Sequence, residues 1–80
     1  MAVKLVFLGR LADLAGAPEL ELEGPLDWSG LVGHLPGSLG EAVAGERVKL
    51  ALNGKVLPDK TALSARNGDE IALLPPVSGG

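Results

Sequence analysis

Three things are scarce in this chain of 80 residues: it has no cysteine, only one phenylalanine and one tryptophan as aromatics, and no long apolar run. Without a thiol, the chain can form no disulfide, no thiolate metal site and no cysteine nucleophile, and we expect a cytoplasmic location. The first apolar stretch is short and is interrupted by Lys4. We therefore expect no signal peptide and no contact with a membrane.

Basic residues and histidine are scarce too. Seven lysines and arginines stand against ten acidic residues, which gives a net charge of −3. An acidic chain with no basic stripe and no aromatic platform binds nucleic acid poorly, so we expect no such partner. His34 is the single histidine, so the sequence shows no metal site and no catalytic triad. We expect Glu19, Glu21 and Glu23 to form a solvated strand face.

The residues that are abundant favour one small folded domain, because 46% are hydrophobic and 21% are charged. Residues 2–8 alternate with largely apolar side chains on both faces, which predicts a central strand. Residues 19–23 alternate strictly, with Leu20 and Leu22 inward, and predict its hairpin partner.

Two stretches predict helices. Residues 11–15 carry apolar side chains at helical spacing until Gly16 ends the turn. Asp27 is a suitable N-cap for a main helix that ends at Pro36. The inner stripe of this main helix would be Trp28, Leu31, Val32 and Leu35. Residues 38–41 have the capping-box pattern and predict a second short helix.

The last third of the chain predicts three more strands. Residues 48–52 and 55–57 form a hairpin around Asn53-Gly54, and residues 58–68 form a loop anchored by Leu63. Residues 70–74 form the last strand, with Ile71 and Leu73 on one face. The element order predicts an α+β fold, a mixed sheet of about five strands with one main helix across one face.

The C-terminal residues carry the strongest functional signal. Pro75-Pro76 cannot continue a β ladder, so the chain leaves the sheet there. Val77, Ser78, Gly79 and Gly80 follow. Glycine has no Cβ, so such an end can thread into another protein's active site, with the Gly80 carboxylate as its one reactive group. We expect residues 1–74 to form the domain and residues 75–80 a flexible tail.

Two segments carry a resemblance to a known family: residues 3–16 (VKLVFLGRLADLAG) and residues 67–80 (NGDEIALLPPVSGG). They resemble the small, sulfur-carrying subunit of molybdopterin synthase, in the MoaD/ThiS-type β-grasp family. Asn53-Gly54 also fits, whereas residues 24–47 match in pattern only. The resemblance implies a β-grasp, ubiquitin-like roll.

The resemblance also implies a mechanism. An ATP-dependent, E1-like activating enzyme would adenylate the Gly80 carboxylate, and a sulfur donor protein would convert it into a thiocarboxylate. The large synthase subunit would then take up the tail and pass the sulfur to a pterin precursor of the molybdenum cofactor, within a heterotetramer. The chain itself would bind no cofactor and would not be catalytic alone.

The resemblance also assigns residues to roles. Gly80 carries the sulfur, while Gly79, Ser78, Val77, Pro76 and Pro75 form the tether. The family commonly has aromatics where Leu8 and Leu74 stand, and a basic residue where Ala12 stands. We expect Leu8 and Leu74 to provide an apolar docking patch and Arg10 to contact the partner.

Three alternatives remain at this point. The chain could be a sibling β-grasp sulfur carrier for thiamine or tRNA thiolation. It could be a ubiquitin-like modifier that is joined through its C-terminus to lysines. It could also be a binding module whose Gly-Gly end is incidental.

Overall fold

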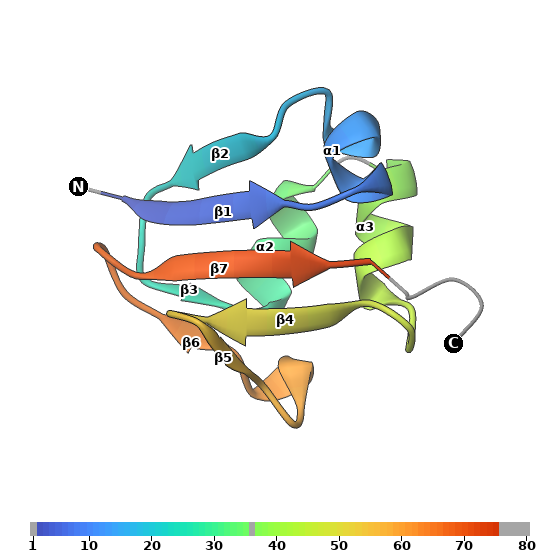
Figure 1. Ribbon diagram of the computed structural model, residues 1–80. Helices are drawn as coiled ribbons and strands as arrows, with labels where there is room; N and C mark the ends of the chain where they lie inside the picture. Colours follow the sequence, from blue (N-terminus) through green and yellow to red (C-terminus); the bar gives the residue numbers. More distant parts are fainter. Residues whose placement is uncertain (1, 36, 76–80) are drawn as a thin grey trace.

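The computed structural model describes residues 2–35 and 37–75, and within them five strands form the main sheet in the order β2-β1-β7-β4-β5. β1 (Val3–Phe7) lies inside the sheet, antiparallel to β2 (Glu19–Leu22) and parallel to β7 (Glu70–Leu74). β4 (Lys49–Leu52) pairs antiparallel with both β7 and β5 (Lys55–Val56). Figure 1 shows β1 and β7 side by side, with their arrowheads pointing the same way.

Helices cover one face of this sheet and leave the other open (Figure 1). α1 (Arg10–Ala15) follows β1, and α2 (Trp28–His34) and α3 (Gly37–Ala44) lie across the covered face. The alternate residues of β1 are buried beneath them, as predicted. The other fully buried large side chains come from both layers: Leu31, Leu39, Val43, Leu50, Ile71 and Leu73.

The α+β class, the central first strand and the hairpin with residues 19–22 are confirmed. Asp27 caps α2 as predicted, because its Oδ1 accepts a hydrogen bond of 2.7 Å from the Gly30 amide. The main helix and the second short helix predicted after it are both present, as α2 and α3, which have seven and eight residues and share the covered face. Leu31 and Leu35 are buried, while Trp28 and Val32 are half-buried.

Leu20, which was predicted to face inward, is exposed, and so is Leu14. Leu14 is 44% exposed because α1 has only six residues and turns Leu11, not Leu14, into the core. Leu20 is 41% exposed although it pairs with the buried Leu5. β2 is an edge strand whose inner side is covered only in part, because Leu22 packs against the core while Leu20 remains exposed.

Two details of the middle region also differ from the prediction. α3 begins at Gly37, so Ser38 lies inside the helix and does not cap it. Residues 58–68 are not all loop: they contain η1 (Lys60–Ala62) and β6 (Ser64–Ala65), and β6 pairs with β3 (Leu26–Asp27) in a second small sheet. Leu63 is buried between η1 and β6, as predicted.

Lys60 ties η1 to the end of α3. Its Nζ donates hydrogen bonds of 2.8 Å to the carbonyl oxygens of Val43 and Val48, and another to that of Gly45. The ammonium also lies 5.6 Å from the centre of the Trp28 ring. Burial lowers the pKa of Lys60, whereas the three carbonyl oxygens favour its charged form. These contacts hold η1 against the C-terminal end of α3 and the connection to β4.

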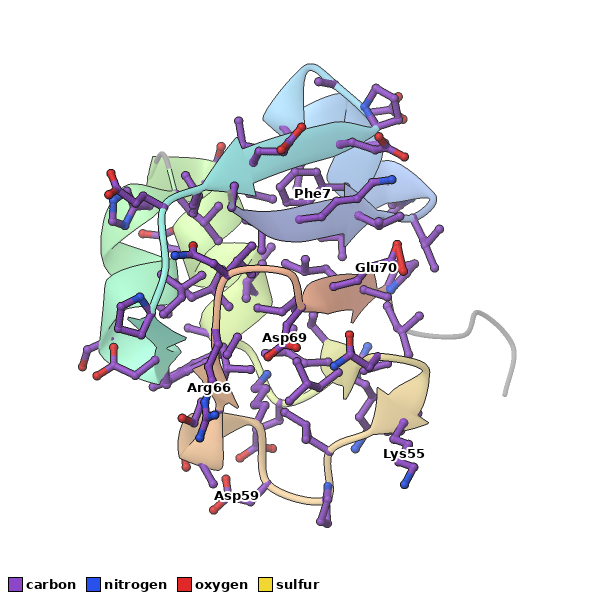
Figure 2. All side chains as sticks on the ribbon, turned by 90° about the vertical axis from the view of Figure 1, so that its left-hand side faces the viewer. Phe7, Lys55, Asp59, Arg66, Asp69 and Glu70 are labelled. Atoms are coloured by element: carbon purple, nitrogen blue, oxygen red, sulfur yellow. The ribbon has the colours of Figure 1, made fainter. Side chains whose placement is uncertain are left out.

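A second polar cluster holds the start of β7, where Figure 2 labels Arg66, Asp69 and Glu70. The Asp69 carboxylate accepts hydrogen bonds from the Arg66 amide at 2.9 Å and from Asn53 Nδ2 at 3.0 Å. The hydrogen bond from the Arg66 amide lowers the pKa of Asp69 the most, and the hydrogen bond from Asn53 lowers it further. Asn53 and Gly54 have positive φ angles of 50° and 86°, which confirms the predicted hairpin turn. None of the described helices has the length and apolarity to cross a bilayer.

Candidate functional site

The predicted tail begins at Pro75, directly after the end of β7. Pro75 is half-buried; Pro76, Val77, Ser78, Gly79 and Gly80 lie outside the described residues. Gly9 adopts a φ of 55°, and a Cβ on it would lie 3.2 Å from Cγ of Pro75. The Leu8 amide donates a hydrogen bond of 3.2 Å to the Leu73 carbonyl, which extends the pairing of β1 and β7 to this point. The end of β1 therefore supports the place where the tail begins.

The open face of the sheet carries an apolar patch that runs up to this place. The strand register aligns Val6, Ala72, Ala51 and Val56 in one row across β1, β7, β4 and β5. Leu8 and Leu74, the next residues on the same face, stand closer to the tail. We call these six residues the open-face patch. Leu8 is 41% and Val56 58% exposed, so the patch offers apolar surface to a partner.

The structure thus brings Leu8 and Leu74 together next to Pro75. Arg10, the third predicted contact residue, is exposed at the start of α1. It shares a groove with Pro75, between α1 and α3. All three residues lie at the end of the sheet from which the tail leaves.

Charge is concentrated at the far end of the open face. Lys4 pairs with Glu70 and Glu21 in the register, one row before Val6, and its Nζ lies 3.3 Å from a Glu19 carboxylate oxygen. Lys49, opposite Leu74, is the charged neighbour at the tail end. The open face therefore carries both signs of charge at the end away from Pro75 and a lysine beside Leu74, an asymmetry that a partner surface could match.

The described residues contain no cluster of acidic or histidine side chains that could hold a metal ion. Glu19 and Glu21 are exposed on β2 and Glu23 just after it, in agreement with a solvated face. His34 is exposed at the end of α2, where its Nδ1 lies 2.7 Å from the Gly30 carbonyl oxygen.

Sequence reasoning missed several members of the site. Val6 and Ala72 could have been found, because strand alternation places them on the faces of Leu8 and Leu74. Ala51 and Val56 join the patch only through the register of β4 with β7 and β5. No sequence pattern indicates that Gly9 lies against Pro75, since the two residues are far apart in the sequence.

The fold, the patch and the tail position define a ubiquitin-like β-grasp protein. The profile of the ThiS family matches residues 5–80, and the chain belongs to this family. No curated protein matches it in sequence.

Solved structures agree with this assignment. SAMP1 from Haloferax volcanii is 28% identical with a TM-score of 0.71, and the match covers 100% of both chains. The small archaeal modifier protein 1 of Methanosarcina acetivorans is 28% identical with a TM-score of 0.65, over 98% of this chain and 95% of that chain. Subunit 1 of the molybdopterin-converting factor from Helicobacter pylori, solved in complex with subunit 2, is 26% identical with a TM-score of 0.67 over 100% of both.

Proposed function

We propose that this chain is a cytoplasmic sulfur carrier and the small subunit of molybdopterin synthase. In this role Gly80 is the C-terminal residue and carries sulfur as a thiocarboxylate. The observation that carries the proposal is the open-face patch, which leads directly to the root of a tail ending in Gly79-Gly80. A partner docked on the patch would receive the tail without any rearrangement of the sheet.

The chemistry divides between the tail and its partners. A carboxylate is a poor electrophile, so an ATP-dependent activating enzyme first converts Gly80 into an acyl adenylate with release of pyrophosphate. Hydrosulfide, supplied by a donor protein, then attacks the acyl carbon and displaces AMP, which leaves the thiocarboxylate. The large subunit, docked on the patch as part of a heterotetramer, guides the thiocarboxylate to the pterin precursor.

The residues around the tail fit this division. Pro75 and Pro76 restrict the tether, which lowers the entropy lost when a partner orders it. Gly79 and Gly80 add no side chain that would obstruct a narrow active site. The Helicobacter pylori complex, in which subunit 1 is bound to subunit 2, supports a large-subunit partner for this chain.

A second candidate function is conjugation to other proteins. The likeness to small archaeal modifier protein 1 favours it. A lysine amine would then attack the same acyl adenylate, which forms an isopeptide bond at Gly80 and releases AMP. Both functions share the activation step and differ in the nucleophile that follows.

Deletion of Gly80 tests the proposed role of the tail. We expect the deletion variant to bind the large subunit through the open-face patch nearly as well as the intact chain, but to support no sulfur transfer. Leu20→Asp is the control, because Leu20 is 41% exposed and lies outside both the patch and the tail, and it should keep both properties. Sulfur transfer by the deletion variant would refute the proposal.

A further inference from the structure

β2 is the longer of the two strands that border the main sheet, since β5 at the other border has only two residues. Figure 1 shows β2 at the upper border of the sheet. Three of its four residues are exposed, and the fourth, Leu22, is half-buried. A border strand of this kind leaves backbone amide and carbonyl groups available for pairing with another chain.

The register shows which backbone groups of β2 are directed outward. The Phe7 amide donates a hydrogen bond of 2.8 Å to the Pro18 carbonyl, so this carbonyl faces β1. Successive residues of an antiparallel strand direct their amide and carbonyl groups to opposite sides. The groups of Leu20 therefore face β1, whereas those of Glu19 and Glu21 face away from the sheet. In the part of the chain that the structure describes, no strand lies on that outer side.

The side chains of β2 define what a paired strand should carry. Glu21 lies on the open face opposite Lys4, and Glu19 lies on the same face, two residues earlier. Leu20 points to the other face, where it is 41% exposed. A segment paired with β2 therefore places every second side chain beside carboxylates and the side chains between them beside an exposed leucine.

Most of the negative charge on this edge is not neutralised. Among the described residues, Lys4 is the one cation in a salt bridge with a β2 carboxylate, and its Nζ lies 3.3 Å from Glu19. Glu21, and Glu23 just beyond the strand, form no such pair there. Opposite charges on directly opposed residues of neighbouring strands stabilise a sheet, and like charges destabilise it. The edge therefore favours a basic strand and disfavours an acidic one.

A second copy of this chain is a poor occupant of the edge. Antiparallel pairing of two β2 strands would oppose the glutamates of one copy to those of the other. β5 of a second copy would offer a ladder of only two residues, Lys55 and Val56. Charged side chains on an edge strand commonly prevent self-association. The charges thus point to a different chain, with basic residues, as the occupant.

We propose that the outer edge of β2 is a docking site for an extended segment of a partner protein in which basic and apolar residues alternate. The segment extends the sheet beyond β2 as an antiparallel strand, which is the slightly more stable orientation. Its basic side chains lie beside Glu19 and Glu21, and an apolar one lies beside Leu20. The edge lies outside the open-face patch, so this partner binds independently of one docked on that face. The inference goes beyond the proposed function and does not depend on it.

The first experiment titrates the full chain with the peptide acetyl-Lys-Val-Lys-Val-Lys-Val-Lys-amide and measures the solvent exchange of backbone amides by NMR. In the free chain, the Leu20 and Leu22 amides should exchange slowly, because they bond to β1, and the Glu19 and Glu21 amides should exchange fast. At a peptide concentration about four times the Kd, exchange at Glu19 and Glu21 should become roughly fivefold slower, because only the free chain exchanges.

Two outcomes of this titration would overturn the proposal. The first is unchanged exchange at Glu19 and Glu21 in millimolar peptide, or changes confined to the open-face patch. The second is protection of these two amides that grows with protein concentration when no peptide is present, since the edge would then belong to a second copy.

Modified peptides test the ladder and the charge separately. N-methylation of the lysine amides removes the donors that face β2 in the antiparallel ladder, and it should abolish the protection. N-methylation of the valine amides changes only the outer side of the peptide and should leave the protection intact. A peptide with glutamate in place of each lysine should not bind. Equal protection by all these peptides, or loss with the valine-methylated one alone, would contradict the proposed pairing.

Variants of the chain complete the test. Glu21→Pro removes the outward amide, and proline is tolerated on an edge strand where the amide faces solvent. This variant should remain folded in a thermal melt and lose the peptide. Glu21→Gln keeps the backbone intact and should weaken the peptide about two- to fivefold through the lost charge attraction. Glu46→Gln is the matched control, because Glu46 is exposed on the connection between α3 and β4. If Glu21→Gln and Glu46→Gln bound the peptide equally well, the charge of the edge would not select the partner.

These experiments include no large subunit, ATP or sulfur, so their outcome is separate from that of the proposed function. A chain that binds the basic peptide at β2 but accepts no sulfur keeps the edge site and loses the carrier role. A chain that accepts sulfur but does not bind the peptide does the reverse.

Discussion

Replacing Leu74 by aspartate separates docking from folding. Leu74 ends β7 on the open face, half-buried, with Lys49 directly opposite on β4. The substitution places a carboxylate in the open-face patch, one residue before the root of the tail. It leaves the covered face of the sheet, where Leu73 and Ile71 are buried, unchanged.

The expected cost to stability is small. Full burial of a leucine side chain contributes about 1.5–3 kcal/mol, so the loss for half-buried Leu74 is about 1 kcal/mol. The poor strand propensity of aspartate adds about 0.5 kcal/mol, and the charge of Lys49 offsets part of the sum. The free energy of unfolding should therefore fall by about 1–1.5 kcal/mol.

The expected cost to docking is larger. An apolar contact near the centre of an interface costs about 2–4 kcal/mol when it is lost, which corresponds to a Kd roughly 30- to 1,000-fold weaker. An unpaired carboxylate buried against the partner raises this cost, because it must be desolvated.

Urea unfolding and calorimetric titration with the large subunit measure the two effects. Leu20→Asp is the matched control, since it makes the same change on an edge strand outside the patch. We expect it to lose a similar amount of stability and no affinity. If Leu74→Asp and Leu20→Asp bound the large subunit equally well, the open-face patch would not be the docking surface.

Two further predictions concern the polar clusters that hold the fold. Lys60→Met removes three hydrogen bonds to carbonyl oxygens and should lower the free energy of unfolding by about 2 kcal/mol, measured in urea; a loss below about 0.5 kcal/mol would contradict this role. The lowered pKa of Asp69 means that its contribution is present above its unfolded pKa and is lost as pH falls through the folded value. Asp69→Asn should therefore reduce the loss of unfolding free energy as the pH falls. Asp59, whose pKa is also lowered, still contributes to that loss in the variant. An unchanged dependence of stability on pH would refute the role of Asp69.

Much of the sheet could be predicted because its signals are local. Alternation alone identified β1 and β7 and the faces of Leu8 and Leu74, and the positive φ angles of Asn53 and Gly54 follow from their residue types. The Asp27 cap could likewise be predicted, because an aspartate directly before an apolar helical stripe can accept a hydrogen bond from a free amide of the first turn.

What could not be predicted depends on neighbours in space. Helical spacing places Leu14 near Leu11, but only the packing of α1 against α3 decides that Leu14 remains uncovered beside the groove. β3 and β6 have two residues each, too few to show a period, and exist because they pair with one another. The closeness of Gly9 and Pro75 likewise follows from the parallel pairing of β1 with β7.

The most direct test of the central claim uses the absence of cysteine. The chain is incubated with ATP, its activating enzyme and a sulfur source, treated with a thiol-selective alkylating reagent, and analysed by tandem mass spectrometry. The site of the label decides the matter, because oxidation of Met1 or Trp28 changes the total mass by nearly as much as replacing oxygen with sulfur. A label on Gly80 is the predicted result. No label, with an activating enzyme shown to work on another substrate, would contradict the sulfur-carrier function.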